Sequence, residues 1–179
     1  MNFLELVKKR RSVRQFRSKP VPRQLIDSCL EAARWAPSAC NSQPWSFIVI
    51  DDGEIRNEIV HKALSGIYKM NAFVKEAPIL IVVLTERSKY IARLGGQLRK
   101  VQYSLIDIGI ACEHLILRAV ELGLGTCWLG WFNEKAIKKI LGLRKSQRVD
   151  VMIGVGYPKP ETRKKEKRRK SLDKLRRYF

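Results

Sequence analysis

Three short stretches of the sequence carry side chains that could bind a ligand. The first, KKRRSVRQF at residues 8–16, places Arg10, Arg11, Ser12 and Arg14 within five residues. Guanidinium groups and a hydroxyl suit a phosphate, because they form charge-assisted and often bidentate hydrogen bonds with it. Basic runs are also common on solvated surfaces, and the residues alone leave both interpretations open.

The other two stretches combine polar groups with stiff or glycine-rich backbone. In PSACNSQPW, residues 37–45, Asn41 and Gln43 can present amide donors and acceptors to the edge of a heterocycle, while Trp45 can anchor the following strand. In GLGTCWLGW, residues 123–131, three close glycines would let the backbone approach a flat ligand. The same glycines would equally serve a tight turn from a helix to a strand.

Motifs for several other kinds of chemistry are absent from the sequence. No GxGxxG follows a strand, and no Gly-rich loop ends in GKS or GKT, so the usual nucleotide-binding loops are missing. Only two histidines occur, which disfavours Ser-His-Asp and Cys-His mechanisms. The four cysteines form no CxxC pair, which argues against zinc and for reduced thiols in a cytosol. An enzyme with so little acid–base machinery would rely on a cofactor.

The sequence predicts helices that alternate with buried strands, and these elements would position the three stretches. Helical spacing of apolar residues predicts helices within 2–12, between Pro22 and Pro37, and at 54–66, 97–122 and 134–143. Short apolar runs predict strands at 46–52, 77–86 and 148–158. In the first helix, Phe3, Leu4 and Val7 are spaced like an inner face, and the helix at 97–122 is expected to be central and buried. The class is therefore α/β or α+β around one core.

Positive charge is concentrated at the two ends of the chain. Residues 1–23 carry eight Lys and Arg against one acid, and residues 161–179 carry ten against three, so the ends supply +14 of the net +19. Such ends indicate an anionic partner or a solvated surface. Nucleic acid is disfavoured because no aromatic residues interleave the basic ones. No apolar stretch reaches membrane-spanning length, and a soluble cytoplasmic protein is expected.

The order of these stretches resembles the FMN-dependent nitroreductase family. The resemblance rests on RRSVRQF, APSACNSQPWSFIV and GLGTCWLG and extends over almost the whole chain. It implies an α+β, three-layer α/β/α sandwich with a mostly antiparallel central sheet, formed by residues 1–179 as a single domain. It also implies an intertwined homodimer with flavin sites at its interface, in which the basic extension 161–179 reaches the partner subunit.

The resemblance further implies an activity and a cofactor. FMN would be the cofactor, NADH or NADPH the reductant, and hydride transfer would be ping-pong through the flavin N5 to a nitroaromatic, quinone or related acceptor. Two alternatives remain open. One is a specialised relative, such as a reductive dehalogenase or a flavin-fragmenting enzyme, which would need dedicated lid residues that the sequence does not clearly offer. With only RSKYIARLGG at 87–96 in place of a capping insertion, either the pocket is open or this stretch alone forms the lid. The other alternative is a flavin- or nucleic-acid-binding protein without turnover.

Site residues follow from the same resemblance, and no side chain is assigned as a catalytic proton donor. Arg10, Arg11, Ser12 and Arg14 would hold the FMN phosphate and ribityl chain, joined by Lys167 and Arg169, or Arg168 in a shifted register. Pro37, Ser38, Ala39 and Asn41 would lie against the flavin of the partner subunit. Asn71 would contact the pyrimidine edge. Cys127, Trp128, Leu129 and Gly130 would pack beside the isoalloxazine ring, with a backbone N–H near N5. Some relatives carry a Glu at the position of Leu129.

Overall fold

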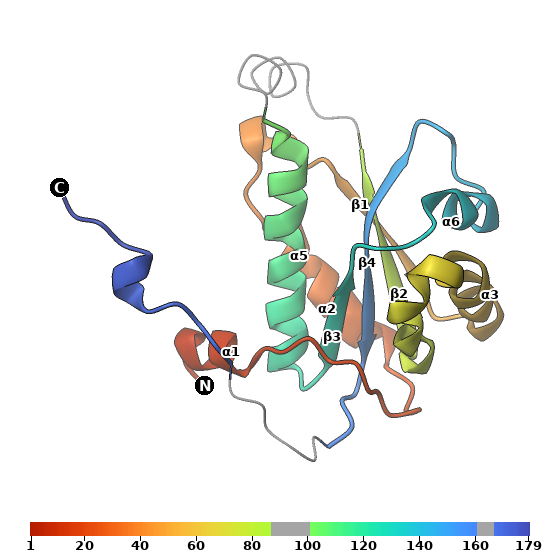
Figure 1. Cartoon of the computed structure of the whole chain (residues 1–179), viewed down its shortest axis with the longest axis horizontal. Helices are drawn as coiled ribbons and strands as arrows, with labels where there is room; N and C mark the ends of the chain where they lie inside the picture. The colour runs from red at the N-terminus through yellow and green to blue at the C-terminus, as the bar shows by residue number, and fades with distance from the viewer. Residues whose placement is uncertain (87–100, 161–166) are drawn as a thin grey trace.

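The computed structural model describes residues 1–86, 101–160 and 167–179, and a four-stranded sheet forms its centre (Figure 1). The strands are β1 (Trp45–Ile50), β2 (Ile79–Thr85), β3 (Gly125–Leu129) and β4 (Arg148–Gly156). They lie in the order β1-β2-β4-β3, and every neighbouring pair is antiparallel. The predicted lid stretch at 87–96 lies outside the described residues.

Helices cover both faces of the sheet and make a three-layer sandwich (Figure 1). One face carries α2 (Arg23–Arg34) and α5 (Tyr103–Glu121); the other carries α3 (Gly53–Ala63), the 3₁₀ segment η2 (Gly66–Glu76) and α6 (Glu134–Ile140). Alternate residues of β2 enter the two cores, with Ile81 on the α5 side and Val82 on the α3 side. Burial on both faces explains why β2 reads as a continuous apolar run. The predicted α+β sandwich is confirmed.

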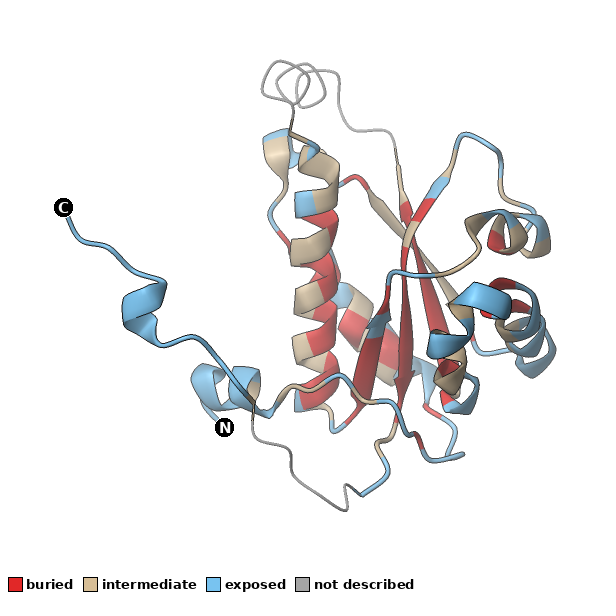
Figure 2. Cartoon of the chain, in the orientation of Figure 1, coloured by how far each residue is buried: buried red, intermediate tan, exposed pale blue. Residues whose placement is uncertain are grey.

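The helix at the N-terminus, α1 (Phe3–Lys9), does not bury its apolar face within one chain. Asn2 and Glu5 close a capping box that defines its start. Phe3 and Leu4 are nonetheless 71% and 59% exposed, and α1 contains no buried residue (Figure 2). The prediction of an inner face was therefore wrong for the single chain, because nothing in the described part of the chain covers that face.

The two ends of the sequence are joined to the same side of the sheet. Val13 N–H donates to the Thr126 carbonyl at 2.8 Å beside β3, and Arg17 N–H donates to the Tyr157 carbonyl at 2.8 Å just after β4. Phe16, between these two contacts, is 1% exposed and bridges to Pro158. The basic stretch at residues 8–16 is thus held along the outer edge of the sheet.

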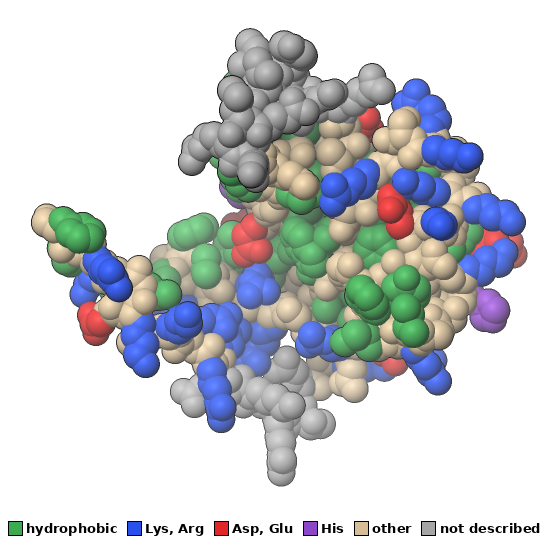
Figure 3. Space-filling view, turned by 45° about the horizontal axis from the view of Figure 1, so that its top comes forward, with side chains coloured by type: hydrophobic (Ala, Val, Ile, Leu, Met, Phe, Trp, Pro, Cys, Tyr) green, Lys and Arg blue, Asp and Glu red, His purple; other side chains and the backbone are tan. Residues whose placement is uncertain are grey.

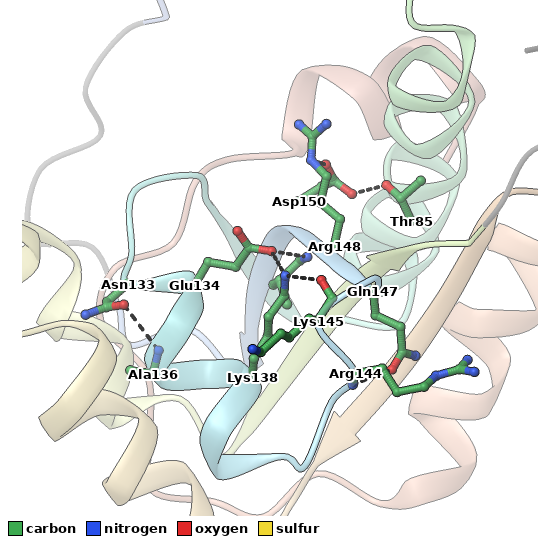
Figure 4. A network of polar contacts seen from close by, with 11 residues as sticks. Thr85, Asn133, Glu134, Ala136, Lys138, Arg144, Lys145, Gln147, Arg148 and Asp150 are labelled. Carbon is green, nitrogen blue, oxygen red and sulfur yellow. Dashed lines mark hydrogen bonds and ion pairs between the residues drawn. The ribbon is translucent and has the colours of Figure 1, made fainter.

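A polar network fastens α6 to the start of β4 (Figure 4). Glu134 Oε1 accepts the Val149 N–H at 3.1 Å and pairs with Lys138 Nζ at 2.7 Å. Partial burial acts to raise the pKa of Glu134, but the Lys138 and Val149 hydrogen bonds outweigh it and hold that pKa below its ordinary value. This fastening fixes the turn at residues 130–133, which follows β3 and leads into α6. None of the helices within the described ranges has the length and apolar character needed to cross a membrane.

Candidate functional site

A single glycine allows the basic stretch to lie against β3. A Cβ on Gly125 would stand 2.6 Å from Val13 Cγ2, closer than real Cβ atoms approach another heavy atom. The missing side chain therefore admits Val13, and the Val13–Thr126 hydrogen bond follows. Ser12 also bridges to Thr126, which is one of two buried polar residues in the described chain. Here the glycine-rich stretch provides close backbone approach, and it forms a strand that the sequence did not predict.

Gly125→Ala is expected to lower the free energy of unfolding by about 1–3 kcal/mol, because overpacking forces Val13 and its strand contact to move. Urea unfolding measures the change. Gly109→Ala, within α5, is the matched control, since a Cβ there meets nothing within 4 Å. That control should gain about 0.5–1 kcal/mol through helix propensity. Wild-type stability in Gly125→Ala would show that Val13 does not pack as closely as described.

The basic C-terminal segment returns to the basic N-terminal stretch. Lys167 Nζ donates to the backbone carbonyl oxygens of Lys8 and Arg10. The Arg10 guanidinium lies 3.7 Å from Glu113 Oε1 of α5. Arg169 instead turns to its own segment and donates to the Arg168 carbonyl at 2.9 Å. The structure therefore brings Lys167 to Arg10 and leaves Arg169 apart, while Figure 3 shows Lys and Arg side chains gathered where this segment meets the body.

Arg14 lies at the junction of β3 and η2. Its guanidinium carbon is 5.8 Å from the centre of the Phe73 ring. Burial raises the pKa of the Cys127 thiol, and the neighbouring charge of Arg14 lowers it only in part. Cys127 is consequently a protonated core thiol and offers no nucleophile.

The outer edge of β3 presents backbone groups on the side where the basic stretch lies. Because the Thr126 carbonyl faces Val13, strand alternation turns the N–H and C=O of Trp128 toward this outer edge as well. The side chains of Cys127 and Leu129 are 3% and 1% exposed, whereas Trp128 is 42% exposed. The Cys127 and Leu129 side chains therefore pack in the core, and their backbone N–H and C=O groups point toward β4, so Trp128 is the residue of this segment whose backbone faces the outer edge.

Asn71 is tied to the turn that follows β3. Its Nδ2 donates to the Trp131 carbonyl at 2.8 Å, and Trp131 Nε1 donates to the Ile67 carbonyl at 3.1 Å. The rings of Tyr68 and Trp131 are 5.3 Å apart between centroids. The structure thus brings Asn71 beside Gly130. Trp131, which fixes this position, was not predicted as a site residue, although an aromatic residue at the end of the glycine-rich stretch was a possible signal.

The loop at residues 37–43 has a strained backbone. Cys40, Asn41 and Gln43 have φ values of 54°, 49° and 45°, in the left-handed region. Each such residue costs on the order of 1 kcal/mol unless its surroundings compensate, and such strain concentrates at functional sites. Ser38 Oγ accepts the Gln43 N–H at 2.9 Å, and Asn41 Oδ1 accepts from Gln43 Nε2 at 2.8 Å. The Asn41 side chain is left with its amide hydrogens to donate.

This loop and the basic stretch meet α5 at different places. The Ala39 N–H donates to Asp107 Oδ1 at 3.1 Å, whereas Arg10 pairs with Glu113. The two acids are six residues apart, which places them about 9 Å apart along the helix and on different sides of it. Figure 1 shows the loop, as the short segment η1 (Ala39–Asn41), near the start of α5 and α1 toward its other end. One chain therefore does not bring Pro37, Ser38, Ala39 and Asn41 to the basic stretch.

Known proteins match this chain over most of its length. The model of the nitroreductase family matches residues 7–157. A provisionally named NADH dehydrogenase/NAD(P)H nitroreductase of Methanothermobacter thermautotrophicus is 32% identical over 162 residues, covering 88% of this chain and 78% of that protein. Iodotyrosine deiodinase 1 of Homo sapiens is 28% identical over 195 residues, covering 97% of this chain and 67% of that protein.

A solved structure shares the fold. The FMN-dependent nitroreductase of Clostridium difficile R20291 superposes with a TM-score of 0.74 at 28% sequence identity, covering 92% of each chain. The family match extends from α1 to the residue after β4 and includes the basic stretch, the strained loop and β3. On this match, and on the sandwich that carries these segments, the chain belongs to the nitroreductase family.

Proposed function

We propose that this protein is an FMN-dependent NAD(P)H oxidoreductase that reduces a nitroaromatic, a quinone or a related acceptor. The observation that carries the proposal is that the basic stretch with Arg10 and Arg14 lies along β3 and that Lys167 returns to the backbone of this stretch. Cations suit a phosphate dianion, and the backbone N–H of an edge strand suits the polar edge of a flavin. The groups present therefore fit FMN in charge and in hydrogen-bonding type.

The basic residues hold the phosphate end of the cofactor in this proposal. Arg10, Arg11, Ser12, Arg14 and Lys167 contact the phosphate and ribityl chain, and Arg169 joins them when its side chain turns away from the Arg168 carbonyl. Each charge-assisted hydrogen bond contributes about 1.5–3 kcal/mol. No covalent attachment is then needed to retain the cofactor.

Residues of η2 and β3 orient the ring in this proposal. The amide of Asn71 addresses the pyrimidine edge, and the backbone of Cys127, Trp128, Leu129 and Gly130 lies beside the ring. FMN, when bound, supplies the redox chemistry, accepting hydride from NADH or NADPH and returning it to the acceptor. The protein contributes position and positive charge, and the strained loop with Pro37, Ser38, Ala39 and Asn41 covers the flavin held by the partner subunit.

Homodimer formation is part of the proposal. The C-terminal segment runs away from the body of the chain (Figure 1), and Leu172, Leu175 and Tyr178 are 62%, 67% and 82% exposed. α1 leaves its apolar face uncovered in the same way, as Figure 2 shows. A second copy of the chain would cover both apolar surfaces and supply the loop that one chain holds apart from its own basic stretch.

The spectrum of the purified protein tests the proposal. A flavin absorption band is expected, bleached by NADH or NADPH without oxygen and restored by a nitroaromatic compound or a quinone. A protein that takes up no FMN would overturn the cofactor assignment. A protein that binds FMN but is reduced by neither nicotinamide would overturn the oxidoreductase assignment and leave the fold untouched.

The similarity to iodotyrosine deiodinase 1 favours a second acceptor class, because it extends over 97% of this chain. In that case the reduced protein would remove iodide from an iodinated phenol. Iodide release from 3-iodotyrosine after anaerobic reduction with dithionite distinguishes the two acceptor classes. Turnover of nitroaromatics without iodide release favours the first.

A further inference from the structure

Asp107 of α5 is a buried carboxylate with no part in the proposed cofactor contacts. It is 4% exposed and, with Thr126, is one of the two polar residues that the described chain buries. Its neighbours Ile108 and Ala111 belong to the apolar core on this face of the sheet. Burying a carboxylate is costly unless its oxygens are hydrogen-bonded, so its presence in an otherwise apolar helix calls for a specific partner.

The partner is the strained loop. Asp107 Oδ1 accepts the Ala39 N–H at 3.1 Å across 68 residues of sequence. Asp107 Oδ2 and Ser42 Oγ are both buried and lack a hydrogen-bond partner among the described residues. The carboxylate therefore keeps acceptor capacity beyond the one bond that it makes to the loop.

The bond to Ala39 lies at the start of the left-handed residues. Ala39 begins η1, and Cys40 and Asn41 follow with φ values of 54° and 49°. The Ala39 carbonyl in turn accepts the Ser42 N–H at 3.1 Å. Ala39 therefore holds the turn at residues 39–42 through both of its backbone groups: its N–H is bound by Asp107, and its carbonyl is bound by the Ser42 N–H. Gln43 Nε2 then donates to the side-chain oxygen of Asn41, Oδ1, at 2.8 Å, so the side-chain amide hydrogens of Asn41 face away from Gln43.

We propose that Asp107 is a positioning residue for cofactor binding: its carboxylate holds the Ala39 N–H against α5, and this contact fixes the left-handed turn that presents the Asn41 amide as a donor. A carboxylate suits this role because it can only accept, so the Ala39 N–H must point toward the helix. The proposal rests on the proposed function, since it takes the loop to be a flavin contact. It adds a residue of α5 to the set that determines cofactor affinity.

Two substitutions at Asp107 separate positioning from packing. Asp107→Leu keeps the branching at Cγ and removes the acceptor, whereas Asp107→Asn keeps one acceptor oxygen at nearly the original volume. Asp107→Leu is expected to raise the dissociation constant for FMN by about tenfold or more, the scale on which loss of a supporting hydrogen bond weakens a bound group. Asp107→Asn should stay within about threefold of wild type, because its carbonyl oxygen can still accept.

Amide hydrogen exchange of Ala39 gives a readout that does not require flavin. The amide should be protected in wild type and Asp107→Asn and should exchange rapidly in Asp107→Leu. Cys112→Ser is the matched control, because Cys112 is fully buried in the same helix and makes no contact with the loop that the structure records. It should lower stability while leaving both FMN affinity and Ala39 protection unchanged.

The outcomes distinguish this inference from the proposed function. Wild-type FMN affinity in Asp107→Leu, or an equal loss of affinity in Cys112→Ser, would overturn the positioning role. Unchanged Ala39 exchange in Asp107→Leu would overturn it as well. If the wild-type protein takes up no FMN, the proposed function fails, and Ala39 exchange alone decides whether Asp107 fixes the loop.

Discussion

Replacing Arg10 and Arg14 together by alanine is expected to give a folded protein that is purified largely without flavin. Each arginine would contribute a charge-assisted contact of about 1.5–3 kcal/mol, so losing both should raise the dissociation constant for FMN by roughly 100- to 10,000-fold. The fold should survive, because the contacts that attach this stretch to β3 are made by the backbone of Val13. Quenching of FMN fluorescence on titration measures the affinity.

A charge-matched variant controls for the loss of two positive charges. Arg23 pairs with Asp51 at the protein surface, and Arg144 lies in the turn after α6. Arg23→Ala combined with Arg144→Ala should therefore bind FMN as wild type does, apart from a small change in salt dependence. Full FMN occupancy in the Arg10/Arg14 variant would show that the phosphate lies elsewhere.

Removing the apolar side chains of the C-terminal segment is expected to abolish the dimer at micromolar concentration. The variant changes Leu172, Leu175, Tyr178 and Phe179 to serine and keeps Lys167 and Arg169. Each of these side chains would contribute about 1.5–3 kcal/mol if buried by the partner, before the entropic cost of association. FMN affinity should fall in parallel, because the partner's loop leaves with it. Analytical ultracentrifugation gives the oligomeric state.

The same segment offers its own control. Changing Lys170, Lys174, Arg176 and Arg177 to serine removes four charges from the same residues 170–177 and leaves every apolar side chain in place. That variant should remain dimeric and retain FMN. A wild-type protein that is already monomeric at high concentration, or an apolar variant that stays dimeric, would show that the exposed C-terminal residues do not mediate association.

The elements with one strong periodicity could be predicted from the sequence. The apolar run of β2 and the helical spacing of α2 were located within a few residues, because burial on both faces or on one stripe leaves an unmistakable pattern. The strand β3 was missed because it is short, glycine-rich and at the edge of the sheet. Glycine there serves the approach of Val13, which lies more than a hundred residues earlier, and no local pattern records such a contact.

The candidate site was predictable in its segments and less so in its geometry. The basic stretch was expected to meet the C-terminal motif, and Lys167 reaches Arg10. The left-handed turn at Cys40 and Asn41 could not be predicted from the sequence, because neither residue type requires a positive φ. Phe3 and Leu4 have the spacing of an inner face but are exposed in the single chain, since a spacing pattern does not say which surface, if any, covers it. The signal for Asp107 was an acid within an apolar helix.

The joining of the two ends of the chain also determines the order in which the protein can fold. β1 and β2 can pair early, but β3 must wait for β4, and the stretch around Phe16 must wait for Pro158. Contacts between residues so distant in sequence slow folding, because loop-closure entropy is lost before the contact forms. On the ribosome, the first helix and the basic stretch emerge long before β3 and β4. The N-terminal segment therefore stays unpaired through most of synthesis, and the domain closes only when nearly the whole chain has emerged.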